Sequence, residues 1–177
     1  MNNHFKRHFF LYTYSLMKYK QKLTTGITLV NKKYKKNQFY HFFQEPNNVI
    51  VIPIINKKFI VISQKREPIN KKNFEFPMGW IDKGETPKEA GERELLEETG
   101  YKSKSRIKEI ATFYADPGRG SRIVYSFYTK SLIKIQKPEK EISINIKSKK
   151  QIINLIKKKQ FNNASHIAAF FSYLYLS

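Results

Sequence analysis

The sequence predicts an α/β fold formed by a single domain. Segments rich in β-branched and aromatic residues, which favour strands, fill much of the first third of the chain. A helix over residues 87–99 has a recognisable signal at each end, and two apolar periodic segments near the C-terminus favour further helices. With 177 residues, 40% of them hydrophobic, the chain is long enough to bury one core.

Two hairpins are expected before the central helix. The first joins residues 24–31 and 38–43 around a lysine-rich turn. The second joins residues 48–55 and 58–63, with Asn56 and Lys57 as a tight connection. This part of the chain is therefore mostly β.

The remaining elements follow the central helix. The same residue preferences predict strands over residues 106–114, 121–129 and 141–146. Helices are predicted over residues 148–158 and 164–175. No repeat or low-complexity linker divides the chain, which supports a single domain.

The central helix has its start and its end encoded in the sequence. Thr86 can cap the first turn, Pro87 suits the first helical position, and Glu89 completes a capping box with Thr86. Gly100 supplies the left-handed residue at which helices commonly end. These signals make residues 87–99 the most firmly predicted helix.

The chain is strongly basic, with 34 Lys and Arg residues against 14 Asp and Glu residues and a formal net charge of +20. Such a charge favours nucleic acid or an anionic membrane surface as a partner, because clustered cations release counterions when they bind polyanions. The lysines are, however, scattered among Asn, Ile, Phe and Tyr, a composition typical of A/T-rich coding sequences. We therefore expect no membrane contact and do not expect nucleic acid as the main ligand, although the basic charge leaves nucleic acid open as a partner.

The chain contains no cysteine, which excludes disulfides, thiolate metal sites and cysteine nucleophiles. The apolar run near the N-terminus is too short to span a bilayer and is not followed by a small-residue cleavage site. We therefore expect residues 1–21 to form a disordered or packed arm, with Met17 as an alternative start. A cytoplasmic setting is expected.

The acidic residues are concentrated in one part of the chain. Eight of the 14 lie between positions 75 and 98: Glu75, Asp82, Glu85, Glu89, Glu92, Glu94, Glu97 and Glu98. Like charges that are packed together repel each other. Such a cluster therefore either decorates a solvated helix face or binds a cation.

Three of these carboxylates belong to neighbouring turns of the predicted helix. Glu94, Glu97 and Glu98 are spaced so that they can project toward one side, and Arg93 lies four residues before Glu97 and can pair with it. Carboxylates beside a glycine-bearing loop form the hard-oxygen site that Mg²⁺ prefers, and Mg²⁺ suits phosphate oxygens. For the short pattern Arg-Glu-Leu-x-Glu-Glu alone, a solvated acidic face would be the better interpretation.

A longer pattern changes that balance. The segment from residue 79 to residue 101 contains Gly79, five residues, Glu85, seven residues, Arg93-Glu94-Leu95, one residue, Glu97-Glu98, one residue, Gly100 and Tyr101. This spacing matches every fixed position of the Nudix box, with Tyr101 where an aliphatic residue is usual. The chain thus resembles the Nudix hydrolases over residues 22–177. The resemblance implies the Nudix fold, a mixed β-sheet sandwiched between helices, and hydrolysis of a nucleoside diphosphate linked to another group.

The resemblance also implies roles for individual residues. Glu94 and Glu98 resemble the main metal ligands, with Glu97 close by and the Met78 carbonyl as a further ligand. Mg²⁺ is the expected ion and Mn²⁺ is an alternative. The remaining fixed residues of the box are expected to support the loop and the helix: Gly79, Glu85, Arg93 and Gly100.

Residues outside the box resemble the ADP-ribose pyrophosphatase branch of the family. Phe74 to Glu85 resembles the segment that leads into the box in that branch, and Gln64-x-Arg66 resembles the end of the preceding strand. Arg66 would then bind the diphosphate bidentately, and Glu75 would join the metal shell or bind the nucleoside portion. Without the family comparison, a surface arginine at a strand end is an equally good interpretation of Arg66.

Two further features lie after the box. Pro117 occupies the position of a proline that marks the ADP-ribose branch, although Asp-Pro-Gly is also an ordinary turn. The family usually places a catalytic or metal-binding glutamate on a later loop, where Glu139 and Glu141 are the candidates, with Glu141 slightly favoured. A solvated loop has about equal weight. If neither glutamate reaches the site, the base is expected among the box glutamates, such as Glu97.

The leading interpretation is magnesium-dependent hydrolysis of ADP-ribose or a related nucleotide sugar to AMP and a sugar phosphate. One alternative is removal of pyrophosphate from the 5′ end of RNA or cleavage of dinucleoside polyphosphates, with the lysine-rich residues 146–159 steering the polyanion. Another is a noncatalytic nucleotide sensor. Residues 22–46 resemble the extra N-terminal β extension with which ADP-ribose pyrophosphatases pair two subunits, so a homodimer is expected.

Overall fold

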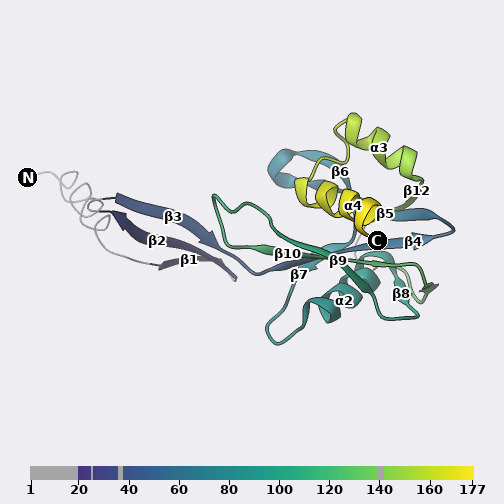
Figure 1. Ribbon diagram of the computed structural model, residues 1–177, viewed down its shortest axis with the longest axis horizontal. Helices are drawn as coiled ribbons and strands as arrows, with labels where there is room; N and C mark the ends of the chain where they lie inside the picture. The colour runs from purple at the N-terminus through teal and green to yellow at the C-terminus, as the bar shows by residue number, and fades with distance from the viewer. Residues whose placement is uncertain (1–19, 25, 36–37, 139–141) are drawn as a thin grey trace, which may run out of the picture. The chain divides into compact units, whose positions relative to one another are not determined.

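The computed structural model describes residues 20–24, 26–35, 38–138 and 142–177. The chain forms two compact units. Among the described residues, the first unit contains those up to residue 46 together with 116–122, and the second contains those of 47–115 and 123–177. The ribbon in Figure 1 labels the helices and strands of each unit.

The first unit is built on a three-stranded antiparallel sheet. Its strands are β1 (Lys20–Thr24), β2 (Ile27–Lys35) and β3 (Gln38–Gln44), in the order β1-β2-β3. The antiparallel N-terminal extension is thus confirmed. The strand predicted over residues 24–31 was wrong at its start, because Gly26 adopts a left-handed φ of 87° and separates β1 from β2.

The second unit contains a mixed seven-stranded sheet. The strand order is β12-β5-β4-β10-β9, with β6 paired to β5 and β7 paired to β4. Strand β10 runs parallel to β4, and the other pairs are antiparallel. The bounds are β4 (Asn48–Ile55), β5 (Lys58–Arg66), β6 (Lys71–Glu75), β7 (Met78–Trp80), β9 (Lys108–Tyr114), β10 (Ile123–Thr129) and β12 (Ser143–Lys147).

Helices cover both faces of this sheet. Helix α2 (Pro87–Thr99) packs against one face of β4, where Val49 and Val51 meet Leu95. Helix α3 (Lys149–Lys157) and helix α4 (Ala164–Leu176) contribute to the other core, which contains Ile50 and Ile52. Figure 1 shows α2 on one side of the strands and α4 on the other. The predicted sandwich is confirmed, and burial on both faces explains the nearly continuous apolar sequence of β4.

The ends of α2 are formed as the sequence predicted. Thr86 Oγ1 accepts a hydrogen bond from the Glu89 N–H, and the Glu89 carboxylate accepts one from the Thr86 N–H at 2.9 Å. The Thr86 N–H and the Thr86 hydroxyl both donate to the Glu89 carboxylate and keep the pKa of Glu89 below its usual value. Gly100 ends the helix with a φ of 68°. An added Cβ there would lie 2.1 Å from the Gln136 carbonyl oxygen, so Gly100 is also required for packing.

Short strands account for most of the differences from the predicted elements. Besides β6 and β7, the structure contains β8 (Tyr101–Ser103) and β11 (Leu132–Lys134), which pair with each other. These segments have three to five residues, too few to show a clear periodicity. The tight turn at Asn56 and Lys57 is confirmed, since both residues have a positive φ. Within the described residues, no helix has the length and apolar character required to cross a membrane.

Candidate active site

Arg93 organises the acidic residues of the second unit. Its Nε and Nη2 donate to the two oxygens of Glu85 at 2.9 and 3.0 Å. Its Nη1 donates to Glu94 at 2.6 Å and to Glu97 at 3.3 Å, which confirms the expected Arg93–Glu97 pair. Nη2 also reaches the Trp80 carbonyl at 2.9 Å. One guanidinium therefore ties the loop before α2 to two carboxylates on the helix.

These contacts favour the charged forms of both Glu85 and Arg93. The hydrogen bonds from Arg93, with a further one from the Asp82 N–H, hold the pKa of Glu85 below its usual value although partial burial opposes them. The hydrogen bonds to Glu85 and then to Glu94 raise the pKa of Arg93. Glu85 and Arg93 therefore stay ionised at neutral pH.

Gly79 allows the Glu94 carboxylate to lie against the backbone of β7. A Cβ at position 79 would lie 1.8 Å from Glu94 Oε1 and 2.0 Å from its Cδ. Any side chain there would therefore displace the carboxylate. The first glycine of the box is required by space in this structure, since its φ is not in the left-handed region.

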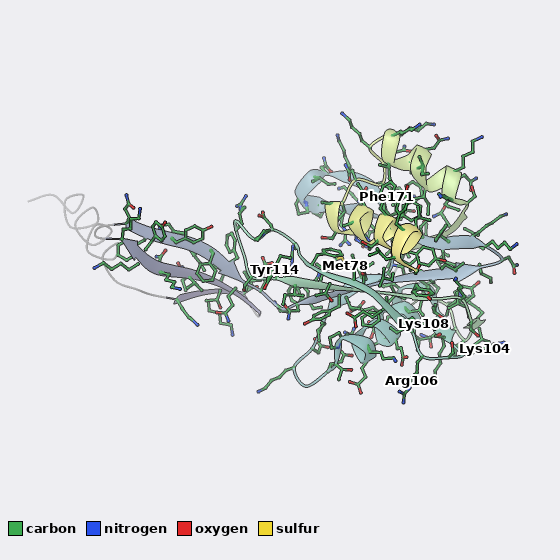
Figure 2. All side chains as sticks on the ribbon, in the orientation of Figure 1. Met78, Lys104, Arg106, Lys108, Tyr114 and Phe171 are labelled. Carbon is green, nitrogen blue, oxygen red and sulfur yellow. The ribbon has the colours of Figure 1, made fainter. Side chains whose placement is uncertain are left out.

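Glu98 is anchored to the same strand by a different contact. Its Oε2 accepts a hydrogen bond from the Met78 N–H at 3.0 Å, and the residue is buried. Met78, labelled in Figure 2, packs partly against the core that includes Ile50 and Phe76. Strand β7 is thus tied to α2 through Glu98 as well as through the close approach of Gly79 to Glu94.

Arg66 and Glu75 form an ion pair at the ends of β5 and β6. Arg66 Nε lies 3.1 Å from both oxygens of Glu75, and Nη2 is also hydrogen-bonded to it. Asn73 Nδ2 donates to the same carboxylate at 2.9 Å. Burial would raise the pKa of Glu75, but the Arg66 hydrogen bond, nearby positive charge and Asn73 outweigh it and lower that pKa. The Glu75 side chain is 1% exposed and the Arg66 side chain 41% exposed, so a buried carboxylate fixes the position of a partly exposed guanidinium.

The buried side chain of His166, in α4, lies beside Glu75 and the residue that follows it. Its Nδ1 accepts a hydrogen bond from the Phe76 N–H at 3.2 Å, and its Nε2 lies 3.9 Å from Glu75 Oε2. Complete burial lowers the pKa of His166 to about 4, although the charge of Glu75 acts in the opposite direction. His166 is therefore neutral at pH 7 and fixes the backbone that follows Glu75.

A cleft of about 520 Å³ brings these groups together in the second unit. Its walls contain residues from β4, the end of β5, β7 and the following loop, and α2: Asn48, Arg66, Met78, Gly79, Trp80, Asp82, Arg93, Glu94 and Glu97. Carboxylates and a partly exposed arginine thus share one surface. Such a surface can bind a cation and an anionic group side by side.

The other predicted site residues lie in different places. Glu75, Glu85 and Glu98 are absent from the cleft wall, and each contacts a residue that lines it. Pro117 belongs to the first unit, in a turn where the Asp116 carbonyl accepts hydrogen bonds from Arg119 and Gly120. The catalytic candidates Glu139 and Glu141 lie outside the described residues.

Three residues of the cleft wall were not predicted from the sequence. Trp80 and Asp82 lie within the box at positions that its pattern leaves free, and Asn48 is the first residue of β4. Trp80 is 42% exposed although it is large and aromatic. A solitary tryptophan directly after the first glycine of the box was the available signal. Asn48 had no comparable signal, since an asparagine before a strand is common.

The donor chemistry of the site suits a hard divalent cation. The carboxylates of Glu94 and Glu97 line the same cleft, and the absent Cβ of Gly79 provides the space that Glu94 fills. In the described part of the chain, no group of three or more His, Asp or Glu side chains is close enough to hold an ion in this conformation. Arg93 contacts two of the carboxylates and the Met78 N–H contacts Glu98. The residues therefore fit a cation by ligand type and location.

Comparison with known proteins agrees with the predicted family and fold. The family model described as "NUDIX domain" matches residues 44–165. The chain belongs to the NUDIX domain family. The expected resemblance to Nudix hydrolases is thus confirmed.

Particular relatives support the expected branch. Over 107 residues the chain is 35% identical to the ADP-ribose pyrophosphatase of Bacillus subtilis (strain 168), an alignment that covers 60% of this chain and 56% of the relative. Over 92 residues it is 36% identical to the methanol dehydrogenase activator of Bacillus methanolicus, covering 51% and 49%. The chain thus spans about half the length of these curated relatives.

A solved structure supports the fold. The crystal structure described as an ADP compounds hydrolase superimposes with a TM-score of 0.74 and covers 89% of this chain and 90% of that one. Its sequence identity is 19%, so the likeness concerns the fold.

Proposed function

We propose that the protein hydrolyses the pyrophosphate bond of ADP-ribose or a related nucleotide sugar, giving AMP and a sugar phosphate. The observation that carries this proposal is the cleft in which Arg66 faces the same space as Glu94 and Glu97. The similarity to the ADP-ribose pyrophosphatase of Bacillus subtilis supports the choice of substrate. The distribution of charge in the cleft supports a diphosphate that is bound by a cation on one side and by a guanidinium on the other.

Mg²⁺ is the proposed ion, with Mn²⁺ as an alternative, and the proposed ligands are Glu94, Glu98 and the Met78 carbonyl. A bound divalent cation would neutralise the diphosphate and lower the pKa of a coordinated water. Gly79 and Arg93 would position Glu94, because one provides its space and the other hydrogen-bonds it.

Arg66 is the proposed diphosphate-binding residue. Glu75 occupies its Nε and Nη2 groups, and no hydrogen bond to Nη1 is found within the described residues. The Nη1 N–H groups can therefore donate to a phosphate oxygen while Glu75 fixes the side chain. We thus assign Glu75 a positioning role for the substrate-binding Arg66.

Glu97 is the proposed general base among the described residues. Its carboxylate lines the cleft, and Arg93 holds it at 3.3 Å. A base must lie within hydrogen-bonding reach of the attacking water, which the cleft wall allows. Glu97→Gln, Glu139→Gln and Glu141→Gln test the assignment side by side, and kcat should fall most for Glu97→Gln. A larger loss for Glu141→Gln or Glu139→Gln would move the base to the later loop.

A panel of substrates tests the proposed reaction. The protein is incubated with Mg²⁺ and, separately, ADP-ribose, ADP-glucose, a dinucleoside polyphosphate and 5′-triphosphorylated RNA. We expect the highest kcat/KM with ADP-ribose. Faster, salt-sensitive turnover of the RNA would favour the alternative activity on nucleic acid. Tight nucleotide binding without turnover of any substrate would favour a sensor.

We also propose that the three-stranded sheet of the first unit pairs two subunits. Large hydrophobic side chains are exposed on it, namely Leu23, Tyr34 and Tyr40. Exposed apolar groups on a sheet are typical of surfaces that bind another chain. Light scattering should give twice the mass of the chain at micromolar concentration, and Leu23→Lys with Tyr34→Lys should reduce it to the mass of one chain. A single-chain mass for the unmodified protein would contradict the proposal.

A further inference from the structure

Asn48 places a buried amide oxygen without a hydrogen-bond donor, within the described residues, in the wall of the cleft. The residue is 6% exposed and lines the cleft together with Arg66 and Trp80. Its Oδ1 makes no hydrogen bond within the described part of the chain. The preceding residue differs, because Asn47 Oδ1 accepts a hydrogen bond from the Ile123 N–H at 3.0 Å.

An unpaired amide oxygen at this position is expected to lower the stability of the free protein. A buried acceptor that has given up its water without gaining a protein donor carries an unrecovered desolvation penalty. The next four positions of β4 are Val49, Ile50, Val51 and Ile52, all fully buried. A small apolar residue at position 48 would satisfy the packing without that penalty. The polar side chain therefore calls for a partner from outside the protein.

The position of Asn48 restricts where that partner lies. In the sheet, Asn48 is opposite Trp80 of β7 on one side and opposite Val124 of β10 on the other. Directly opposed residues project to the same face, so the amide lies beside the partly exposed indole of Trp80. Since Arg66 and Glu94 line the same cleft, the partner lies close to the proposed diphosphate site.

We propose that Asn48 is a specificity-determining residue that hydrogen-bonds a sugar hydroxyl next to the diphosphate. An unpaired acceptor needs a donor, and an ionised diphosphate offers only acceptors. A sugar hydroxyl both donates and accepts, as does a primary amide, so the two groups complement each other. This inference rests on the proposed function, because it takes the sugar to be part of the substrate.

Two adjacent alanine variants separate this role from a structural one. Asn47→Ala removes a hydrogen bond of the fold, so its Tm should fall while ligand binding stays unchanged. Asn48→Ala removes an unpaired group, so its Tm should be equal to or higher than that of the unmodified protein. Its affinity for ADP-ribose should fall about tenfold, the loss expected for one hydrogen bond.

Binding is measured by calorimetry in the presence of EDTA, which prevents metal-dependent turnover. Inorganic pyrophosphate serves as the ligand that has the diphosphate but no sugar. Asn48→Ala should weaken ADP-ribose and leave pyrophosphate unchanged. Asn48→Ser, which keeps a hydrogen-bonding group, should lie between the alanine variant and the unmodified protein.

Two results for Asn48→Ala would overturn the inference. If Asn48→Ala lowers Tm as Asn47→Ala does and leaves the Kd of ADP-ribose unchanged, Asn48 is structural. If it weakens ADP-ribose and pyrophosphate equally, the amide contacts the diphosphate. Absence of ADP-ribose binding by the unmodified protein under these conditions would contradict this inference, whereas the substrate panel with Mg²⁺ decides the proposed function separately. If the protein binds ADP-ribose without hydrolysing it, the proposed function fails while the Kd comparison still decides the role of Asn48.

Discussion

The contact between Gly79 and Glu94 gives a sharp prediction for Gly79→Ala. The new Cβ would lie 1.8 Å from Glu94 Oε1, so the carboxylate must move. It is the end of a flexible side chain, and the fold can accommodate the movement by a change of rotamer. The carboxylate would nevertheless leave its place 2.6 Å from Arg93 Nη1. The variant should therefore fold and yet misplace a proposed metal ligand.

The magnitudes follow from these contacts. Loss of one hydrogen bond between charged groups costs about 1.5–3 kcal/mol, and a chain of this length loses roughly 2–4 °C of Tm per kcal/mol. Tm should thus fall by about 3–12 °C. A displacement of about 1 Å in a catalytic group costs about 100-fold in rate, so kcat/KM for ADP-ribose should fall by at least that factor.

Gly84→Ala provides the matched control. Gly84 has a φ of 89°, and an added Cβ would meet nothing within 4 Å. Only backbone strain of about 1–2 kcal/mol is expected there. Both variants are compared by thermal unfolding and by release of AMP from ADP-ribose with Mg²⁺. Gly79→Ala with the kcat/KM of the unmodified protein would refute the positioning of Glu94 by Gly79.

Three further variants test other contacts. Arg66→Lys loses the planar contact with Glu75 and should raise KM for ADP-ribose about tenfold, measured by steady-state kinetics, whereas an unchanged KM would exclude Arg66 from substrate binding. Because the folded-state pKa of His166 is about 4, against an ordinary 6.5, the unfolded state takes up its proton first as pH falls, so stability is lost between pH 6.5 and 4. Between pH 7 and 5 this titration lowers the free energy of unfolding by about 2 kcal/mol, a loss that His166→Asn should remove. Thermal unfolding of both proteins at pH 7 and 5 measures it, and an unchanged pH dependence of Tm in the variant would contradict this. Thr86→Ala breaks the capping box and should lower Tm by roughly 2–4 °C with unchanged KM, and a Tm equal to that of the unmodified protein would mean that the cap contributes nothing.

Local sequence signals predicted much of the fold because they act over a few residues. The capping box of Thr86 and Glu89 and the left-handed Gly100 each determine an end of α2 through adjacent groups. The strand predicted over residues 48–55 is β4, and the burial of both its faces explains its nearly continuous apolar sequence. The short strands β6, β7, β8 and β11 depend on partners that are distant in the sequence, and their own composition contains little strand preference.

The candidate site was predictable to the extent that a fixed spacing encodes it. The pairing of Arg93 with Glu97 follows from helix geometry, whereas its contacts with Glu85 and the Trp80 carbonyl depend on how the loop folds back. The cleft also contains Asn48, which lies opposite Trp80 in the pairing of β4 with β7. Trp80 is 32 positions further along the chain, and no local pattern specifies this register.

The most direct test of the account is the product of ADP-ribose incubation, resolved by chromatography, for the unmodified protein and Glu98→Gln. The carboxylate of Glu98 is proposed to bind the metal, while a glutamine oxygen can still accept the Met78 N–H, so the variant should keep its Tm. We expect the unmodified protein to release AMP and ribose 5-phosphate in equal amounts with Mg²⁺ and neither with EDTA. We expect Glu98→Gln to release almost none. Equal product release by Glu98→Gln, or release that EDTA leaves unchanged, would contradict the account.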